Sequence, residues 1–568
     1  MLSSVYTSRL SPTPRLTDAL AGVMIVGAYF WLIGPRLGLP LVYDDVSFAL
    51  GAQAVAATGQ PFGNQGYLLH LSDQRQQWAL WHPPLYVYAL GLITFIMGSS
   101  ETSMRLLGVA CQLLTAGVTW RLAVLMTPAG LASSWVGPLA AAFFLLCPLT
   151  LQSSQVLDID NTVLTLLISV SVWLAARRGG GWSPAYGALV AVVLALGFWA
   201  KVTSPIVVCI AIVFTRFWQP GGVRLAGQGL SAAILGIAGF ALTWWGISQL
   251  LGWPISYTFD VIRAEAAESA LSSAERFASP MAFIAGAAPA ILWLSPGLTL
   301  LFLLAGLPRL RSLVAGRGLT GADVIVVCGA ALYLPYVMKL AGGFAKYHAP
   351  VVPLWAACAA ALVAPYVSRL SPMSRALAAG WCAMSITLLE PWAADWEPVF
   401  QETLIWSGLV APLVAFAGGC ALALLLRRES LWRALLVGLL TFTMATDVSL
   451  GLNDRTAPGS TAYYRGRIGQ REAAVLLNTR LRNDQVFVAS KDVAWYASSS
   501  HFVDQESWQF HVWEERHGQF DGSWMGSTVT LLALEVSHEP TWKAYRAVLD
   551  PAYELVGQAG SYAVYQRK

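Results

Sequence analysis

The chain has 568 residues, of which 56% are hydrophobic and only 12% are charged, and its formal net charge is +4. Soluble proteins carry about 25% charged residues, so this composition excludes a water-soluble enzyme, a secreted protein, a DNA-binding protein and a peripheral membrane enzyme. Residues 1–450 hold 41 of the charges, whereas the last 118 residues hold 25. The contrast predicts a membrane domain over residues 1–450 and a small soluble domain over residues 451–568.

Thirteen apolar stretches between residues 16 and 450 reach the length of about 17–25 residues that a transmembrane helix needs. A further apolar stretch, residues 83–98, is shorter and begins with two prolines. If it lies along the membrane surface, 15 arginines fall on one side of the membrane together with three acids. Positive charge accumulates in cytoplasmic loops, so we expect a cytoplasmic N-terminus, thirteen spans and an extracytoplasmic C-terminal domain.

This topology leaves two long segments on the outer side, residues 38–103 and residues 251–281. The first includes the membrane-lying stretch, and the second carries an amphipathic pattern over residues 260–276. The soluble tail shows helical spacing over residues 470–481 and strand-like runs at 485–489, 528–533 and 553–565, the last of which predicts a hairpin. The tail is therefore predicted to be a small α/β domain.

Two acidic clusters fall on the outer side of this topology. Asp44 and Asp45 are adjacent just after the first span, and Asp158 and Asp160 stand at the entry of the fourth. Carboxylates at a membrane surface lose hydration energy unless they bind a cation or take part in acid–base chemistry. An acidic loop that merely follows the charge asymmetry is the alternative for the first pair, and helix N-capping explains one residue of the second.

Basic residues at the outer ends of the spans are lysines, although the chain has only six lysines against 29 arginines. Lys201 lies between two spans with almost no loop, and Lys346 is followed by Tyr347 and His348. An ammonium group suits a phosphate at the membrane surface, and attraction of the lysine to lipid headgroups is the alternative. His82 lies at the same level and would reach the same anion.

Acids and phosphate-binding bases on one side suit substitution at a sugar carbon that carries a lipid-phosphate leaving group. One carboxylate takes the proton of the acceptor hydroxyl, and cations stabilise the departing phosphate. A lipid-linked activated sugar is the expected energy source, because ATP is scarce outside the cytoplasm.

Six short motifs on the outer side stand in a recognisable order. They are Asp44-Asp45, His82-Pro83-Pro84-Leu85-Tyr86, Arg105-Leu106, Leu157-Asp158, Lys201, and Lys346-Tyr347 with Pro350 and Pro353. Their order over residues 16–370 resembles the GT-C glycosyltransferases, above all the aminoarabinose lipid A transferase and protein O-mannosyltransferase families. The resemblance implies thirteen spans, membrane-lying helices in the first outer loop and a polyprenyl-phosphate sugar donor.

The resemblance also assigns roles to the acids. It gives Asp44 the role of general base and carries a second acidic position to Asp158, with Asp160 as its rival because the alignment can slip by two residues. The family pair is commonly Asp-Glu, whereas the pair here is Asp44 and Asp45, which leaves open which carboxylate acts. No dedicated metal site is predicted, and a divalent cation on Asp44 and Asp158 is left open.

The donor phosphate would be held by lysines and their neighbours. The resemblance assigns this role to Lys201 and to the Lys346-Tyr347 pair, beside which we include His348. The position before the two prolines is lysine in some relatives and His82 here. Arg263, on the amphipathic pattern of the second outer loop, completes the predicted set without matching a motif.

The sequence therefore predicts an inverting membrane glycosyltransferase that acts at the extracytoplasmic face of a bacterial inner membrane. Its partners would be a polyprenyl-phosphate sugar, membrane lipids and a hydroxyl-bearing glycan, lipid or protein of the cell envelope, and no nucleic acid. A transporter or flippase of lipid-linked sugars is the first alternative, a polysaccharide polymerase or ligase the second, and an inactive assembly subunit the third. Sugar and acceptor are left open.

Overall fold

The structure is a computed structural model of the whole chain. It describes residues 16–41, 44–63, 78–127, 135–178, 181–263, 295–315, 318–337, 345–371, 431–452, 468–482, 485–498, 502–505, 529–536 and 551–568, with residue 549 and scattered residues between 375 and 421. The part of the predicted outer loop 251–281 beyond residue 263 lies outside these ranges, as do parts of several predicted spans.

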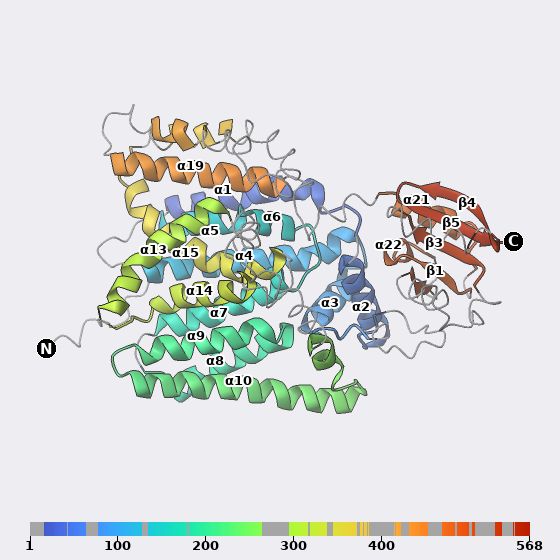
Figure 1. The fold of residues 1–568 in the computed structure, drawn as a ribbon, viewed down its shortest axis with the longest axis horizontal. Coiled ribbons are helices and arrows are strands. Elements are labelled where there is room, and N and C mark those ends of the chain that lie inside the picture. The colour runs from blue at the N-terminus through green and yellow to red at the C-terminus, as the bar shows by residue number, and fades with distance from the viewer. Residues whose placement is uncertain are drawn as a thin grey trace, which may run out of the picture.

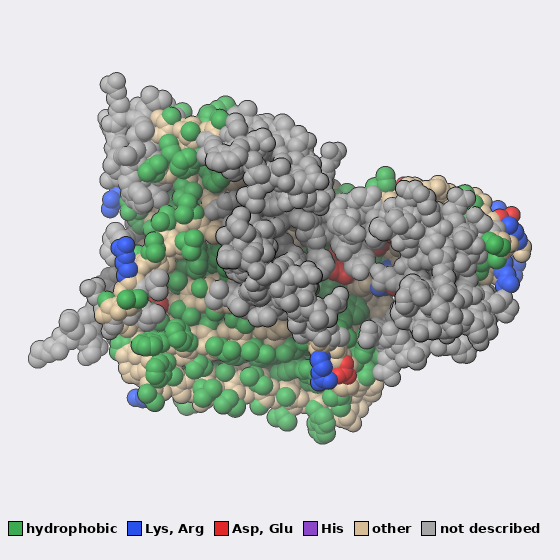
Figure 2. Space-filling model, viewed as in Figure 1, with side chains coloured by type: hydrophobic (Ala, Val, Ile, Leu, Met, Phe, Trp, Pro, Cys, Tyr) green, Lys and Arg blue, Asp and Glu red, His purple; other side chains and the backbone are tan. Residues whose placement is uncertain are grey.

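Helices form the larger part of the molecule and run alongside one another (Figure 1). In chain order the main ones are α1 (Leu16–Ile33), α4 (Glu101–Met126), α5 (Val136–Leu145), α6 (Pro148–Ser153), α7 (Thr165–Arg177), α8 (Pro184–Ala200), α9 (Thr203–Phe217), α10 (Gly222–Leu251), α13 (Pro296–Val314), α14 (Asp323–Val337), α15 (Val352–Val367) and α19 (Leu431–Leu452). On the face shown in Figure 2, apolar side chains cover much of the bundle and charged ones gather near its ends. This is the surface expected of a bundle surrounded by lipid.

Three described helices are long and apolar enough to cross a membrane, at residues 101–126, 222–251 and 347–367. Eight shorter apolar helices accompany them. The count of thirteen spans stays a prediction. One predicted span is interrupted in the structure, because residues 132–152 divide into α5 and α6 before Pro148. The fourth span begins with a single π-helical turn, η4 (Asp160–Leu164), which continues directly into α7.

Two helices lie at the end of the bundle that faces the soluble domain (Figure 1). They are α2 (Asp44–Thr58), which begins with the acidic pair, and α3 (Leu85–Met97), which packs against it. Thirteen residues of helix span about 20 Å, less than the roughly 30 Å of a hydrocarbon core. The outward side chains of α3, Leu92, Phe95, Ile96 and Met97, are more than half exposed and apolar. These properties favour the predicted position along the membrane surface.

The C-terminal region forms a five-stranded sheet with the order β2-β1-β3-β5-β4. Its elements are α21 (Gln470–Asn478), β1 (Phe487–Ala489), α22 (Lys491–Ala494), β2 (Phe502–Asp504), β3 (Leu531–Glu535), β4 (Tyr553–Ala559) and β5 (Tyr562–Arg567). Strand β1 pairs in parallel with β2 and β3, and β5 pairs antiparallel with β3 and β4. The predicted sheet and terminal hairpin are confirmed, and β2 is an additional strand that the sequence did not indicate.

Candidate active site

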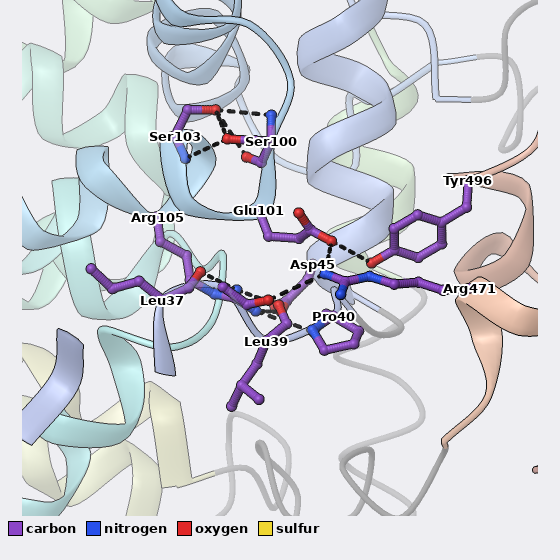
Figure 3. Close-up of polar contacts among 11 residues, drawn as sticks. Leu37, Leu39, Pro40, Asp45, Ser100, Glu101, Ser103, Arg105, Arg471 and Tyr496 are labelled. Carbon is purple, nitrogen blue, oxygen red and sulfur yellow. Dashed lines mark hydrogen bonds and ion pairs between the residues drawn. The ribbon is translucent and has the colours of Figure 1, made fainter. Parts of the chain in front are cut away.

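A buried arginine organises the end of the bundle that faces the soluble domain (Figure 3). Arg105 lies one turn into α4 with 2% of its surface exposed. Its guanidinium donates to four backbone carbonyls, those of Leu37, Leu39 and Pro40 on one side and of Gln155 on the other. Because the planar guanidinium carries five N–H donors, a single side chain can fix both segments at once.

The two carboxylates of the acidic pair lie in different surroundings. Asp45 is 3% exposed, and its Oδ1 accepts a hydrogen bond of 2.8 Å from the backbone N–H of Leu157. Its Oδ2 lies 3.8 Å from Nη2 of Arg105. Asp44, at the first position of α2, is only partly buried. Asp45 thus joins the first outer segment to the second, whereas Asp44 stands at the more accessible place.

Asp158 follows Leu157 directly, so the Asp45 contact brings both outer acidic clusters together. It is 4% exposed and lies close to Tyr86 at the start of α3. Burial raises the pKa of Tyr86 well above its ordinary value, and the charges of Asp158 and Asp45 raise it further. Tyr86 therefore keeps its phenolic proton. The sequence analysis named it only as part of a motif and gave it no role in the site.

Asp160 and Lys201 meet inside the protein. Asp160 opens η4, and Lys201 ends α8 in an extended conformation before α9 begins. Nζ of Lys201 donates to both carboxylate oxygens of Asp160, at 2.9 and 2.7 Å, and lies 4.1 Å from the centroid of the Tyr347 ring. A candidate catalytic carboxylate and a candidate phosphate-binding lysine thus form one ion pair beside an aromatic ring.

Tyr347 comes from a short 3₁₀ helix, η5 (Ala345–Val351), which also carries His348. His348 is 5% exposed, and its ring centroid lies 5.7 Å from that of Tyr333. The backbone of Lys346 belongs to η5, but its side chain lies outside the described part of the chain. The η5 segment therefore places a ring from the predicted phosphate set directly on Lys201.

His82 and Arg263 are the remaining members of the predicted phosphate-binding set. His82 is partly buried just before α3. The hydroxyl of Thr258 donates to the carbonyl of Leu80, which ties the stretch before His82 to the second outer segment. Arg263 has an exposed side chain and pairs with Asp260 at 3.7 Å. Among the members of the predicted phosphate-binding set whose side chains the structure describes, Arg263 is the most exposed to solvent.

The described residues contain no group of three or more His, Cys, Asp or Glu side chains that could hold a metal ion. At Asp45, the carboxylate already serves the Leu157 amide and the Arg105 guanidinium. A divalent cation bound by Asp44 and Asp158 stays a prediction.

Comparison with known proteins relates this geometry to a class of enzymes. Residues 81–245 match the family model of dolichyl-phosphate-mannose-protein mannosyltransferases. The structure is similar to crystal structures of ArnT from Cupriavidus metallidurans in the apo state and bound to undecaprenyl phosphate. In both cases the sequence identity is 15%, the TM-score is 0.58, and the match covers 97% of this chain and 98% of ArnT. No curated protein matches the sequence.

The family match over residues 81–245 and the fold shared with ArnT make this chain similar to integral membrane glycosyltransferases. The resemblance that the order of the outer motifs predicted is therefore confirmed. Within this class, the segment from Trp81 to Trp245 is the part that matches the mannosyltransferase model. That segment contains α3, α4, Asp158, Asp160 and Lys201.

Proposed function

We propose that the protein transfers a sugar from a polyprenyl phosphate to an acceptor hydroxyl, with Asp44 as the general base. The observation that carries this proposal is the difference between the two adjacent acids. Asp45 is buried and bound to Leu157 and Arg105, whereas Asp44 is more accessible at the same helix start. A general base must reach the proton of the incoming hydroxyl, and Asp44 meets this requirement better than its neighbour.

The reaction is a single displacement at the anomeric carbon. The acceptor oxygen forms the new bond, its proton passes to Asp44, and the bond between carbon and phosphate oxygen breaks with its electron pair leaving on the phosphate. Attack opposite the leaving group inverts the configuration of the sugar carbon. Preorganised cations near the leaving oxygen lower the barrier, because negative charge develops there in the transition state.

The donor phosphate would bind near Lys201 and the η5 segment. Lys201 and Tyr347 are already in contact, and Lys346 precedes Tyr347 in the same 3₁₀ helix. The carboxylate of Asp160 compensates the charge of Lys201, so the phosphate would have to share this lysine with Asp160. The structure of ArnT bound to undecaprenyl phosphate supports a polyprenyl phosphate as the donor class. His82, His348 and Arg263 are secondary candidates for the same anion.

The proposed topology follows from this chemistry. The proposed site comprises the acids, Lys201 and η5, at the end of the bundle that faces the sheet domain. The site and the sheet domain would therefore both lie on the extracytoplasmic face of a bacterial inner membrane. Residues 1–450 would form the catalytic membrane domain and residues 451–568 the soluble domain. The acceptor would be a glycan, lipid or protein of the cell envelope, and Asp44 with Asp158 would be the place for a divalent cation if one is required.

The test uses the full-length protein reconstituted in vesicles with a labelled polyprenyl-phosphate sugar. We expect wild-type protein to release free polyprenyl phosphate as the sugar is transferred. Asp44→Asn should lower the transfer rate by about 10²- to 10⁴-fold, the range for removing a general base, while donor binding is retained. Glu554→Gln is the control, because it neutralises an exposed acid on β4 of the soluble domain that has no part in the proposed site, and its rate should be unchanged.

Other results would contradict the proposal in distinct ways. Movement of intact labelled donor across the bilayer without release of polyprenyl phosphate would indicate a flippase. Transfer by Asp44→Asn at the wild-type rate would remove Asp44 as the base. Transfer that is lost with EDTA and restored by a divalent ion would show that the reaction requires a cation, which a reaction with Asp44 acting alone as the base does not. Activity only with a diphosphate-linked donor would favour a polymerase or ligase.

A further inference from the structure

The short segment that leads into the acidic pair is held from two domains. Arg105 of the membrane domain binds the carbonyls of Leu37, Leu39 and Pro40. The one carbonyl between them, that of Gly38, accepts a hydrogen bond of 3.2 Å from Nη2 of Arg471, which belongs to the soluble domain. Four consecutive carbonyls are therefore bound by two guanidinium groups, one buried and one from the neighbouring domain (Figure 3).

The same arginine of the soluble domain binds the start of α4. Nη2 of Arg471 pairs with Oε1 of Glu101, and the hydroxyl of Tyr496 donates to the same oxygen at 2.9 Å. The guanidinium also lies 5.5 Å from the centroid of the Tyr496 ring. Glu101 is the first residue of α4 and stands one turn before Arg105. Arg105 and the carboxylate that binds Arg471 therefore belong to the same helix end.

Both sides of this contact are built rigidly. A reciprocal capping box between Ser100 and Ser103 fixes the first turn of α4. On the other side, Arg471 lies in the first turn of α21, whose N-cap Gly469 has a φ of +98°. A side chain at Gly469 would collide with the carbonyl of Ala559, so the start of α21 rests against the β4–β5 turn. Each partner of the contact is therefore carried by a helix start that is itself held in place.

We propose that Arg471 and Tyr496, through Glu101 and Gly38, are positioning residues for the acidic pair of the active site. The soluble domain thereby acts on the site through the segment of residues 37–40, and correct placement of Asp44 and Asp45 requires that it is docked. The relevance of this contact to sugar transfer rests on the proposed function. The mechanical link itself does not, because it concerns only hydrogen bonds within the chain.

The exposure of the contact indicates which effect to expect. The side chain of Arg471 is 47% exposed and that of Glu101 is 17% exposed. Partly exposed ion pairs add little to global stability. Loss of this pair should therefore loosen the segment and the acids that follow it, and should leave the unfolding temperature of the whole protein nearly unchanged.

Hydrogen exchange of the full-length protein in detergent tests the link without any sugar substrate. The amide of Leu157 is a direct probe, because it donates to Asp45. In Arg471→Ala, the backbone amides of residues 37–39, 41 and 44–46 and that of Leu157 should exchange about tenfold faster, as expected for a local opening. The control is Arg480→Ala, which removes an exposed arginine bonded to Gln566 within the soluble domain and should leave these amides unchanged. Unchanged exchange in Arg471→Ala would overturn the proposal.

Kinetics then separate positioning from a structural role. We expect Arg471→Ala and Glu101→Gln to lower kcat about tenfold or more with the donor KM within about twofold of wild type, since misplacement of a catalytic group affects the transition state. Arg471→Lys should recover part of the loss because it retains the charge. A wild-type kcat in Arg471→Ala would overturn the catalytic part. Absence of transfer in the wild-type protein would refute the proposed function, while the exchange result still decides the link.

Discussion

Lys201 and Asp160 form a two-point ion pair in the interior of the bundle, with Nζ 2.9 and 2.7 Å from the two carboxylate oxygens. Their side chains are 7% and 2% exposed. Removing both charges from water costs several kcal/mol, which such a pair offsets only when its geometry is good. The sequence placed one residue among the acids and the other among the phosphate ligands, so their pairing changes how each is expected to act.

Breaking this pair from one side should destabilise the protein. Asp160→Asn leaves an ammonium buried without its carboxylate, and we expect the free energy of unfolding to fall by about 3–5 kcal/mol. The double variant Asp160→Asn with Lys201→Met should be less destabilised than the sum of the two single variants. Thermal unfolding in detergent measures the stability of the wild-type protein, the two single variants and the double variant. Strictly additive losses would mean that the two side chains are not energetically coupled.

A second prediction concerns the contact between α2 and α3. A methyl group at Gly91 of α3 would lie 2.6 Å from Cγ1 of Val55 on α2, so one helix must shift. Because α2 begins with the acidic pair, Gly91→Ala should reduce both stability, by about 1–3 kcal/mol, and transfer rate. Gly117→Ala on α4 is the control, since its added methyl meets nothing within 4 Å. Equal behaviour of the two variants would show that the helices adjust freely.

The sequence could predict the site as far as charge placement allows. In a chain so poor in charge, the outer acids and lysines were found from topology alone, and the structure joins Asp45 to Leu157 beside Asp158. The partners could not be predicted, because Asp160 and Lys201 are 41 residues apart and meet only through the packing of the helices. Arg105 was visible only as part of a motif, since its four acceptors are backbone carbonyls, which leave no trace in residue identity.

The soluble domain shows the same limit for the fold. The predicted runs that overlap β1, β3 and the β4–β5 hairpin contain β-branched or aromatic residues, and the sequence indicated these strands. Strand β2, Phe502–Asp504, is as short as β1, but polar residues flank it on both sides in the sequence, so no longer apolar run marks it. Its parallel pairing with β1 is a long-range choice that local propensity does not encode. Likewise, nothing local marks Arg471 or Tyr496 as partners of Glu101.

Docking of the soluble domain should depend on pH at the alkaline end. Burial raises the pKa of Tyr496 above its ordinary value near 10, and the charge of Glu101 and the hydrogen bond to it raise it further. A raised pKa in the docked state means that docking is full below about pH 10 and weakens as the pH rises through the raised pKa. Energy transfer between dyes on the two domains should fall in that range.

Two variants check the origin of this alkaline loss. Tyr496→Phe has no phenolic proton to lose, so its energy transfer should be lower at neutral pH but flat up to the alkaline limit. Tyr553→Phe removes a tyrosine whose pKa is also raised by burial but which donates to Val529 within the sheet domain. It should keep the wild-type profile. A wild-type profile in Tyr496→Phe would assign the loss to another group.

Arg105 should be intolerant even of lysine. A lysine ammonium keeps the charge but presents its donors from one nitrogen, so it cannot serve the carbonyls near residues 37–40 and that of Gln155 together. Each buried acceptor left without a donor costs about 1–3 kcal/mol. We therefore expect Arg105→Lys to unfold at lower temperature and to lose transfer activity about 10²-fold or more, as for a misplaced catalytic group.

Arg121→Lys is the matched control, because Arg121 is an exposed arginine on the same helix, and it should retain both the unfolding temperature and the transfer activity. If Arg105→Lys transferred sugar like wild type, the charge alone would hold the outer segments, and the fork of hydrogen bonds would be unnecessary for the site.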